Sequence, residues 1–137
     1  MPHLTEQPDH CNLVRDAIEM LQDACYATSL KSGFWNEYLE MRDSLTGQPS
    51  RQNYLFVTNT LAKLDLIHSE VSEATEAVRK PGPDKHCPEF TNLEGELADI
   101  VIRVMDLAGA LYMDLGDAVL EKMRHNTTRP FKHGKEA

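Results

Sequence analysis

The strongest constraint on this chain is a pair of long segments with helical spacing of apolar residues, separated by Pro81-Gly82-Pro83. The first runs from about residue 53 to 79, and the second begins at Thr91. Apolar residues three and four positions apart line one face of a helix, and Pro denies the next turn its hydrogen bond. We therefore expect two long helices joined by a loop. Their expected buried positions are Leu61, Leu64, Ile67, His68, Val71, Ala74, Thr75 and Val78, then Leu93, Leu97, Ile100, Val101, Val104, Leu107, Ala108 and Leu111.

Shorter patterns flank this pair. Apolar spacing predicts a helix over about 13–30, with Gly33 as its stop signal, and another from Asp114 to near Asn126. Thr91 and Glu94 form a capping-box pattern that marks the start of the second long helix. Residues 32–52 predict an ordered loop with at most a short helical turn. The expected buried positions of the flanking helices are Leu13, Val14, Ala17, Ile18, Leu21, Ala24 and Cys25, then Leu115, Ala118, Val119 and Met123.

Four helices with short connections predict an all-α, four-helix-bundle-like protomer. At 137 residues the chain has the length of one domain, spanning 1–137, with 1–11 as a flexible lead-in and 127–137 as a basic C-terminal tail. Few aromatic residues lie outside 26–56, which disfavours an all-β fold.

The formal charge of −8 disfavours a nucleic-acid polymer as partner, because such binders are normally basic. A polyanionic ligand would need a local basic patch or a metal ion as intermediary. The N-terminal segment is polar without a basic run, so we expect neither a signal peptide nor a membrane span. Three cysteines without a Cys-x-x-Cys pair predict reduced thiols in a cytoplasmic protein.

Each long helix carries a pair of acidic residues, Glu70 and Glu73 in the first and Glu96 and Asp99 in the second. Residues three apart lie on one face of a helix. Both pairs adjoin apolar positions, so the four carboxylates are expected at the edge of the seam between the helices and can converge when the helices pack. One such pair alone is usually a solvated or salt-bridged face.

Converging carboxylates need a compensating charge at neutral pH, which a hard divalent cation supplies. The oxygen donors indicate Mg²⁺, with Mn²⁺ as a substitute. Zinc would favour Cys and His ligands, and a ferritin-like di-iron site takes Glu-x-x-His. The chain also has no P-loop motif. Oxygen-ligated Mg²⁺ fits the pattern better than these alternatives.

The C-terminal region is basic in an otherwise acidic chain. Such a region is often only a solubilising tail favoured by the helix dipole. Its mixture of Lys, Arg, Asn and His also suits phosphate and nucleoside contacts. Trp35, beside Gly33, is either a core residue or a platform on which a base stacks. The candidate substrate-binding residues are Trp35, Lys122, Asn126, Arg129, Lys132, His133 and Lys135.

Three segments carry a family resemblance: HSEVSEATEAVRK (68–80), ELADIVIRVMDLAG (96–109) and DLGDAVLEKMRHNTTRPFKHGK (114–135). They resemble the MazG-like members of the all-α nucleoside triphosphate pyrophosphohydrolases. GFW (33–35) resembles a segment that many of those proteins carry before the first acidic pair. The resemblance covers about 33–135.

The resemblance implies a helical protomer that assembles into dimers or tetramers and hydrolyses an NTP or dNTP to a monophosphate and pyrophosphate. It implies Mg²⁺ held by Glu70, Glu73, Glu96 and Asp99, which are also the catalytic candidates. It further implies that Lys122, Asn126, Arg129 and the His133-Gly134-Lys135 tail contact the substrate, even across a subunit boundary. Several relatives have an acid where this chain has Ser69, so water activation is expected to differ if that acid is a base.

Two other functions remain open on the sequence. One is a dUTPase-like or dCTPase-like enzyme with narrow pyrimidine specificity. The other is a non-catalytic helical bundle that senses nucleotides or binds another protein, although four clustered carboxylates would serve no purpose there. Neither the base nor the sugar of the substrate follows from the residue pattern.

Overall fold

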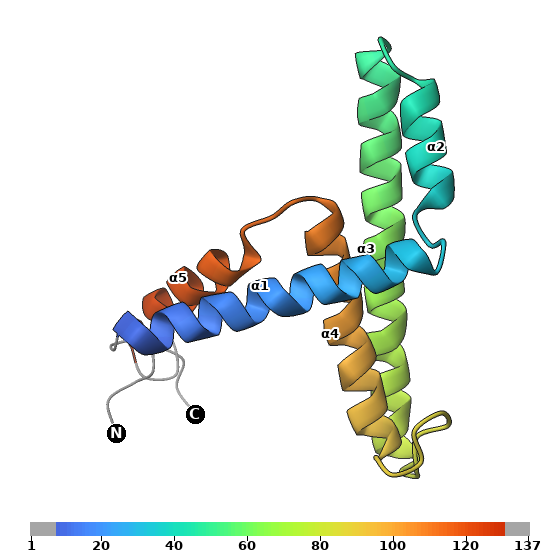
Figure 1. Cartoon of the computed structure of the whole chain (residues 1–137). Coiled ribbons are helices and arrows are strands. Elements are labelled where there is room, and N and C mark those ends of the chain that lie inside the picture. Colours follow the sequence, from blue (N-terminus) through green and yellow to red (C-terminus); the bar gives the residue numbers. More distant parts are fainter. Residues whose placement is uncertain (1–7, 131–137) are drawn as a thin grey trace.

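The computed structural model describes residues 8–130, and these residues form five helices (Figure 1). They are α1 (Pro8–Lys31), α2 (Asn36–Ser44), α3 (Pro49–Arg79), α4 (Asn92–Ala110) and α5 (Leu115–Thr127). Within this range the only β-type pairing is an isolated bridge between Pro83 and Thr91. The predicted all-α class is therefore confirmed. None of the described helices is both long and apolar enough to cross a bilayer.

Helices α3 and α4 form an antiparallel hairpin, with their connection at one end (Figure 1). The predicted boundaries are close to those observed. Helix α3 ends just before the Pro81-Gly82-Pro83 segment, and α4 begins with the predicted capping box. In that box Glu94 N donates to Thr91 Oγ1 at 3.2 Å, and Thr91 N donates to Glu94 Oε2 at 2.8 Å.

The hairpin connection is fixed by the side chain of Asn92. Its Nδ2 donates to the Lys80 carbonyl oxygen at 2.9 Å, and its Oδ1 accepts from Gly82 N at 3.3 Å. Asn92 N also donates to Gly82 O at 2.8 Å. These bonds join the C-terminal end of α3 to the first turn of α4. They help set the register in which the two acidic pairs face each other.

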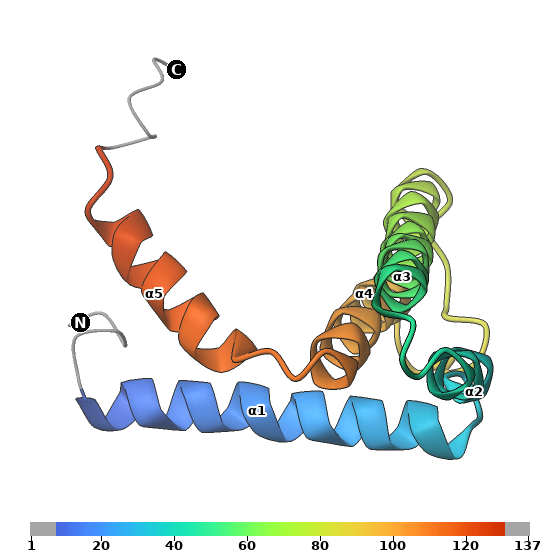
Figure 2. The same ribbon diagram turned by 90° about the horizontal axis from the view of Figure 1, so that it is seen from above.

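Helix α1 supports the rest of the protomer. Its C-terminal half crosses the hairpin, and α5 lies along its N-terminal half (Figures 1 and 2). The crossing with α4 is close at Gly109, where a Cβ atom would lie 2.6 Å from Tyr26 Cβ. The approach to α5 is close at Gly116, where a Cβ atom would lie 2.9 Å from Arg15 O. Small residues thus allow both contacts.

The predicted helix limits need three corrections. Helix α1 begins at Pro8, so residues 8–11 are not part of a flexible lead-in; residues 1–7 lie outside the described range. The predicted loop over 32–52 contains the nine-residue helix α2. Helix α3 begins at Pro49, because Pro fits the first turn of a helix, where its missing N–H is not needed.

The described part of the protomer is more open than the predicted bundle. Figure 2 shows α5 beside the N-terminal half of α1 and the α3–α4 hairpin at its C-terminal half, so none of the described helices closes the hairpin into a bundle. Several large apolar positions predicted as buried are exposed; they are Leu13, Leu21, Leu61, Leu64, Val71, Val78, Leu97, Val101 and Met123. The buried apolar residues among those described are Cys11, Trp35, Ala74, Ala77, Leu107, Ala108 and Leu120.

Candidate metal centre

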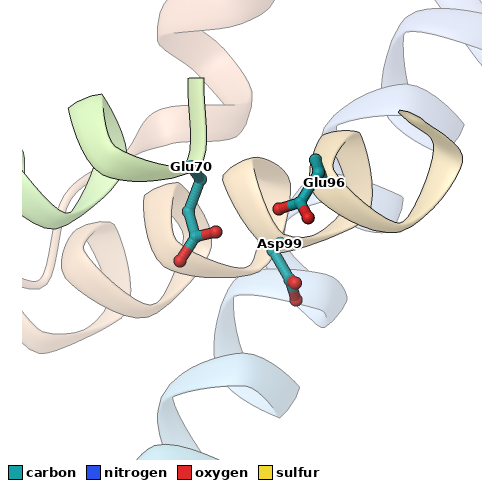
Figure 3. Close-up of side chains that lie close together, drawn as sticks. All are labelled: Glu70, Glu96 and Asp99. Carbon is teal, nitrogen blue, oxygen red and sulfur yellow. The ribbon is translucent and has the colours of Figure 1, made fainter. Parts of the chain in front are cut away.

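Three of the four predicted carboxylates meet between α3 and α4. Glu70 reaches from α3, and Glu96 and Asp99 reach from successive turns of α4 (Figure 3). One oxygen atom of each carboxylate lies within 4.8 Å of the others. All three donors are carboxylate oxygens, the ligand type that hard divalent cations prefer. The donor set therefore fits Mg²⁺ or Mn²⁺.

Glu73 takes a different position. Its side chain is exposed and lies outside the group of three, although it shares a small pocket of about 240 Å³ with Glu96. The Glu73 charge also contributes to the raised pKa of Glu96. Glu73 is thus a neighbour of the cluster rather than one of its three converging carboxylates. Ser69, the residue before Glu70, is also exposed.

The carboxylates of the cluster repel one another. Burial raises the pKa of Glu96, and the nearby charges of Glu73, Glu70 and Asp99 raise it further. Burial also raises the pKa of Asp99, as does the Glu70 charge, against an opposing effect of Arg103. Both groups therefore hold protons at higher pH than ordinary carboxyls. A cation at this position would relieve the repulsion between them.

Arg103 is a member of the site that the sequence interpretation missed. It lies one turn beyond Asp99 on α4, and its Nε is 2.5 Å from Oε1 of Glu70. The Glu70 side chain is 8% exposed and that of Arg103 is 40% exposed. The signal was present in the spacing of Glu96, Asp99, Arg103 and Asp106, which places four charged residues on one face of an otherwise apolar helix.

A further carboxylate approaches from the hairpin loop. Asp84 Oδ1 accepts from His86 N at 2.9 Å and from Cys87 N at 2.7 Å. Those backbone bonds lower the pKa of Asp84, whose charge in turn raises the pKa of Asp99. The carboxylate fits against α4 because residue 95 is glycine: a Cβ atom there would lie 2.1 Å from Asp84 Oδ2.

A cavity of about 720 Å³ adjoins the cluster, with Asp99 and Arg103 in its wall. Most of the wall is apolar, and α1, α3 and α4 supply most of it. This volume lies in the range of small-molecule sites. The other lining residues are Leu21, Ala24, Cys25, Thr28, Ser29, Ser32, Phe34, Lys63, Leu66, Ile102 and Asp106.

Trp35 lies in the core, the first of the two positions that its sequence context allowed, so the prediction of Trp35 as a substrate-binding residue is corrected. It is 1% exposed and does not line the cavity. The rings of Tyr26 and Tyr38 meet it edge-on at 6.0 and 5.8 Å, and Lys63 Nζ lies 4.3 Å from its ring centroid. The neighbouring Phe34 is 72% exposed and does line the cavity. In this protomer Phe34 is thus the aromatic residue within reach of a ligand.

Trp35 instead supports one wall of the cavity through Asp106. Trp35 Nε1 donates to Asp106 Oδ1 at 2.9 Å, and Ser29 Oγ donates to Asp106 Oδ2 at 3.1 Å. Asp106 and Ser29 both line the cavity. The indole N–H therefore fixes the orientation of a wall carboxylate, a role that the sequence alone did not indicate.

Among the described residues, the predicted substrate contacts of the C-terminal region do not join the carboxylates within a single chain. Lys122 and Asn126 are exposed on α5, and Arg129 is exposed just after it. Helix α5 packs along α1, away from the hairpin (Figure 2). Lys132, His133 and Lys135 lie outside the described residues. Lys63 and Arg103 are the cationic residues of the cavity wall.

Comparisons with known proteins leave the family open. No protein-family model, no curated protein and no solved structure matches this chain. The family resemblance consequently remains a prediction from the sequence motifs.

Proposed function

We propose that the protein is a Mg²⁺-dependent pyrophosphohydrolase that cuts a nucleoside triphosphate into a monophosphate and pyrophosphate. The observation that carries this proposal is the position of three converging carboxylates, Glu70, Glu96 and Asp99, beside a largely apolar cavity of about 720 Å³. The cluster suits a cation that binds phosphates, and the cavity has room for a base and sugar. A nucleotide contains both kinds of group.

Glu70, Glu96 and Asp99 would hold the cation. When bound, Mg²⁺ supplies charge neutralisation for the phosphates and makes water more acidic. Asp84 reinforces the negative potential from the loop. The three carboxylates, of which Glu70 is buried, Glu96 half-buried and Asp99 exposed, would thus share one role, which is to hold and orient the charged end of the substrate.

Glu73 is the residue we assign as general base. It is exposed and adjacent to Glu96, whereas Glu70 already accepts a bond from Arg103. A base must reach the proton of the attacking water, and a carboxylate beside the ligands has that access. Arg103 and Lys63, on the cavity wall, are placed to stabilise phosphate charge.

We also propose that the active form is a homo-oligomer. Val57, Leu61, Leu64, Val71 and Val78 form an exposed apolar stripe along α3, and Leu97 and Val101 are exposed on α4. Contiguous exposed apolar surface is typical of association sites. We further propose that a second copy brings its α5 cations to the carboxylate cluster, because α5 packs on α1 and not on the hairpin within a single chain.

The proposed activity is tested by incubating the full chain with Mg²⁺ and each common ribo- and deoxyribonucleoside triphosphate, then quantifying monophosphate and pyrophosphate. Equal amounts of both products support the proposal. Products from pyrimidine nucleotides alone would narrow it to a dUTPase-like or dCTPase-like enzyme. Binding without products would favour a nucleotide sensor, and release of orthophosphate would contradict the bond assigned here.

A further inference from the structure

Arg103 connects the carboxylate cluster to the cavity. Its Nε lies 2.5 Å from the nearly buried Glu70 carboxylate, while its 40% exposed side chain also lines the cavity wall. A buried carboxylate without a partner is costly, so Arg103 is the residue that compensates Glu70 when no metal is present. The same carboxylate belongs to the group of three proposed to hold the cation.

We propose that Arg103 is a resident counterion that exchanges with the divalent cation and is thereby freed to bind the phosphates of the substrate. This inference rests on the proposed function, because it assumes that Glu70 is a metal ligand. Two cations on one carboxylate repel each other, so metal binding weakens the hold on Arg103. The freed guanidinium lies at the cavity wall and has the fork of donors that suits phosphate oxygens.

Lys63, the other cation of the cavity wall, is held differently. Its Nζ donates to the Phe34 carbonyl oxygen at 3.3 Å and lies over the Trp35 ring. Burial lowers the pKa of Lys63. Neither of these contacts involves a carboxylate of the cluster, so metal binding would not release Lys63. The exchange is specific to Arg103 among the cations of this wall.

The first experiment measures thermal unfolding in chelator and in Mg²⁺ for the wild type, Arg103→Ala and Arg103→Gln. Loss of the guanidinium leaves Glu70 without its charge partner, so both variants should melt lower in chelator and gain more from Mg²⁺ than the wild type. Arg42→Ala is the matched control, because the ion pair of Arg42 is with exposed Asp43 on α2 and not with the cluster. A gain from Mg²⁺ equal to or smaller than that of the wild type would overturn the proposal.

The second experiment separates exchange from a purely structural ion pair. Titration with Mn²⁺ alone should give severalfold tighter binding to Arg103→Gln, because the competing cation is gone. Binding of inorganic pyrophosphate in saturating Mg²⁺ should weaken by about tenfold, the equivalent of about 1.4 kcal/mol. Changes of opposite sign support the exchange. Weaker binding of both Mn²⁺ and pyrophosphate, or unchanged binding of both, contradicts it.

The wild type distinguishes this proposal from the proposed function. If the wild type binds Mn²⁺ but hydrolyses no nucleotide, the proposed function is wrong. Opposite changes in Mn²⁺ and pyrophosphate binding by Arg103→Gln would still support the exchange. If it hydrolyses nucleotides and the variant binds Mn²⁺ unchanged, the exchange alone is wrong. A wild type that binds no Mn²⁺ overturns both.

Discussion

The α3–α4 hairpin and the pair formed by α1 and α5, called here the α1–α5 arm, differ in whether they bring their predicted site residues together. In the hairpin, helices that follow each other in the chain bring Glu70, Glu96 and Asp99 together, with Asn92 fixing their connection. In the arm, α5 lies along α1, so Lys122 and Asn126 stay exposed and away from the carboxylates. The comparison teaches that the acidic half of the candidate site is local, whereas the described part of its predicted basic half is not brought to it within a single chain.

The largest expected effect comes from removing a cluster carboxylate. Asp99→Asn should reduce turnover by at least about 100-fold, because a ligand to the proposed cation is lost. Circular dichroism should be unchanged, and the variant should melt at the same or higher temperature in chelator, since the raised pKa of Asp99 marks an unfavourable charge. Asp65→Asn, exposed on α3, is the control. Full activity of Asp99→Asn would remove the metal-cluster mechanism.

Glu73→Gln tests whether Glu73 acts as the general base while the three other carboxylates hold the metal. If Glu73 is the general base, kcat should fall by about 100-fold. Its position outside the group of three predicts that Mn²⁺ affinity stays close to that of the wild type, unlike in Asp99→Asn. Metal titration and steady-state kinetics on the same preparation make this distinction. An equal loss of Mn²⁺ binding in both variants would place Glu73 among the ligands instead.

The hairpin connection should matter for stability and for the site together. Asn92→Ala removes bonds to Lys80 O and Gly82 N, which should lower the free energy of unfolding by about 1–2 kcal/mol. It should also weaken Mn²⁺ binding, because the register of α3 against α4 is loosened. Asn53→Ala, at an exposed position near the start of α3, should do neither. Urea denaturation and metal titration measure the two effects.

The pH dependence of stability should show the charge of the cluster. Because the folded-state pKa values of Glu96 and Asp99 are raised, the folded protein holds protons that the unfolded chain has released. Stability in chelator should therefore fall as pH rises from about 4, the ordinary carboxyl value, through the raised pKa values. Addition of Mg²⁺ or the substitution Asp99→Asn should each reduce this dependence of stability on pH, with stability measured by urea denaturation. The same slope for the wild type in chelator, the wild type in Mg²⁺ and Asp99→Asn would contradict this role of the cluster.

Below about pH 4 the expected pH dependence of stability has the opposite sign, because two other carboxyls near the hairpin loop have lowered pKa values. The pKa values of Asp84 and Glu94 are lowered by backbone hydrogen bonds, so their contribution is present above the ordinary carboxyl value and is lost as pH falls through the lowered values. Asp84→Asn should therefore flatten the acid limb of the stability curve without removing the slope above pH 4.

The smallest expected effect lies in the arm. If a second copy brings α5 to the cluster, Lys122→Ala should raise KM about three- to tenfold at unchanged kcat, the loss of one charged phosphate contact. Specific activity of the wild type should also rise with protein concentration as the oligomer forms. Lys31→Ala, at the end of α1, is the control. An unchanged KM in Lys122→Ala would argue against a phosphate role for α5.

Local signals explain what was predictable. The Pro81-Gly82-Pro83 segment and the Thr91–Glu94 capping box act within a few residues, so the end of α3 and the start of α4 followed from the sequence. Helix α2 was missed because its N-cap residue, Trp35, provides no side-chain cap and none of its own residues is buried. Such a helix has neither a start signal nor an apolar stripe to reveal it.

The sequence predicted which helix faces carry the acidic residues, but it did not predict how each helix is rotated about its own axis. Residues three apart point about 60° from each other. The spacing therefore placed Glu70 and Glu73 on one face of α3 but did not decide which would enter the cluster. Burial of the apolar stripes was overpredicted because it assumed a closed bundle, and the exposed Leu61 and Val78 show that one protomer does not close it. The Trp35–Asp106 bond joins segments too distant for any local pattern.

The position of the single tryptophan has a practical consequence. Trp35 is the only indole in the chain, and its N–H is bonded to a carboxylate of the cavity wall. Its fluorescence is therefore an intrinsic optical reporter of that wall. A nucleotide entering the cavity would disturb Asp106 and the ammonium group over the ring, so the emission should respond to binding without any attached dye.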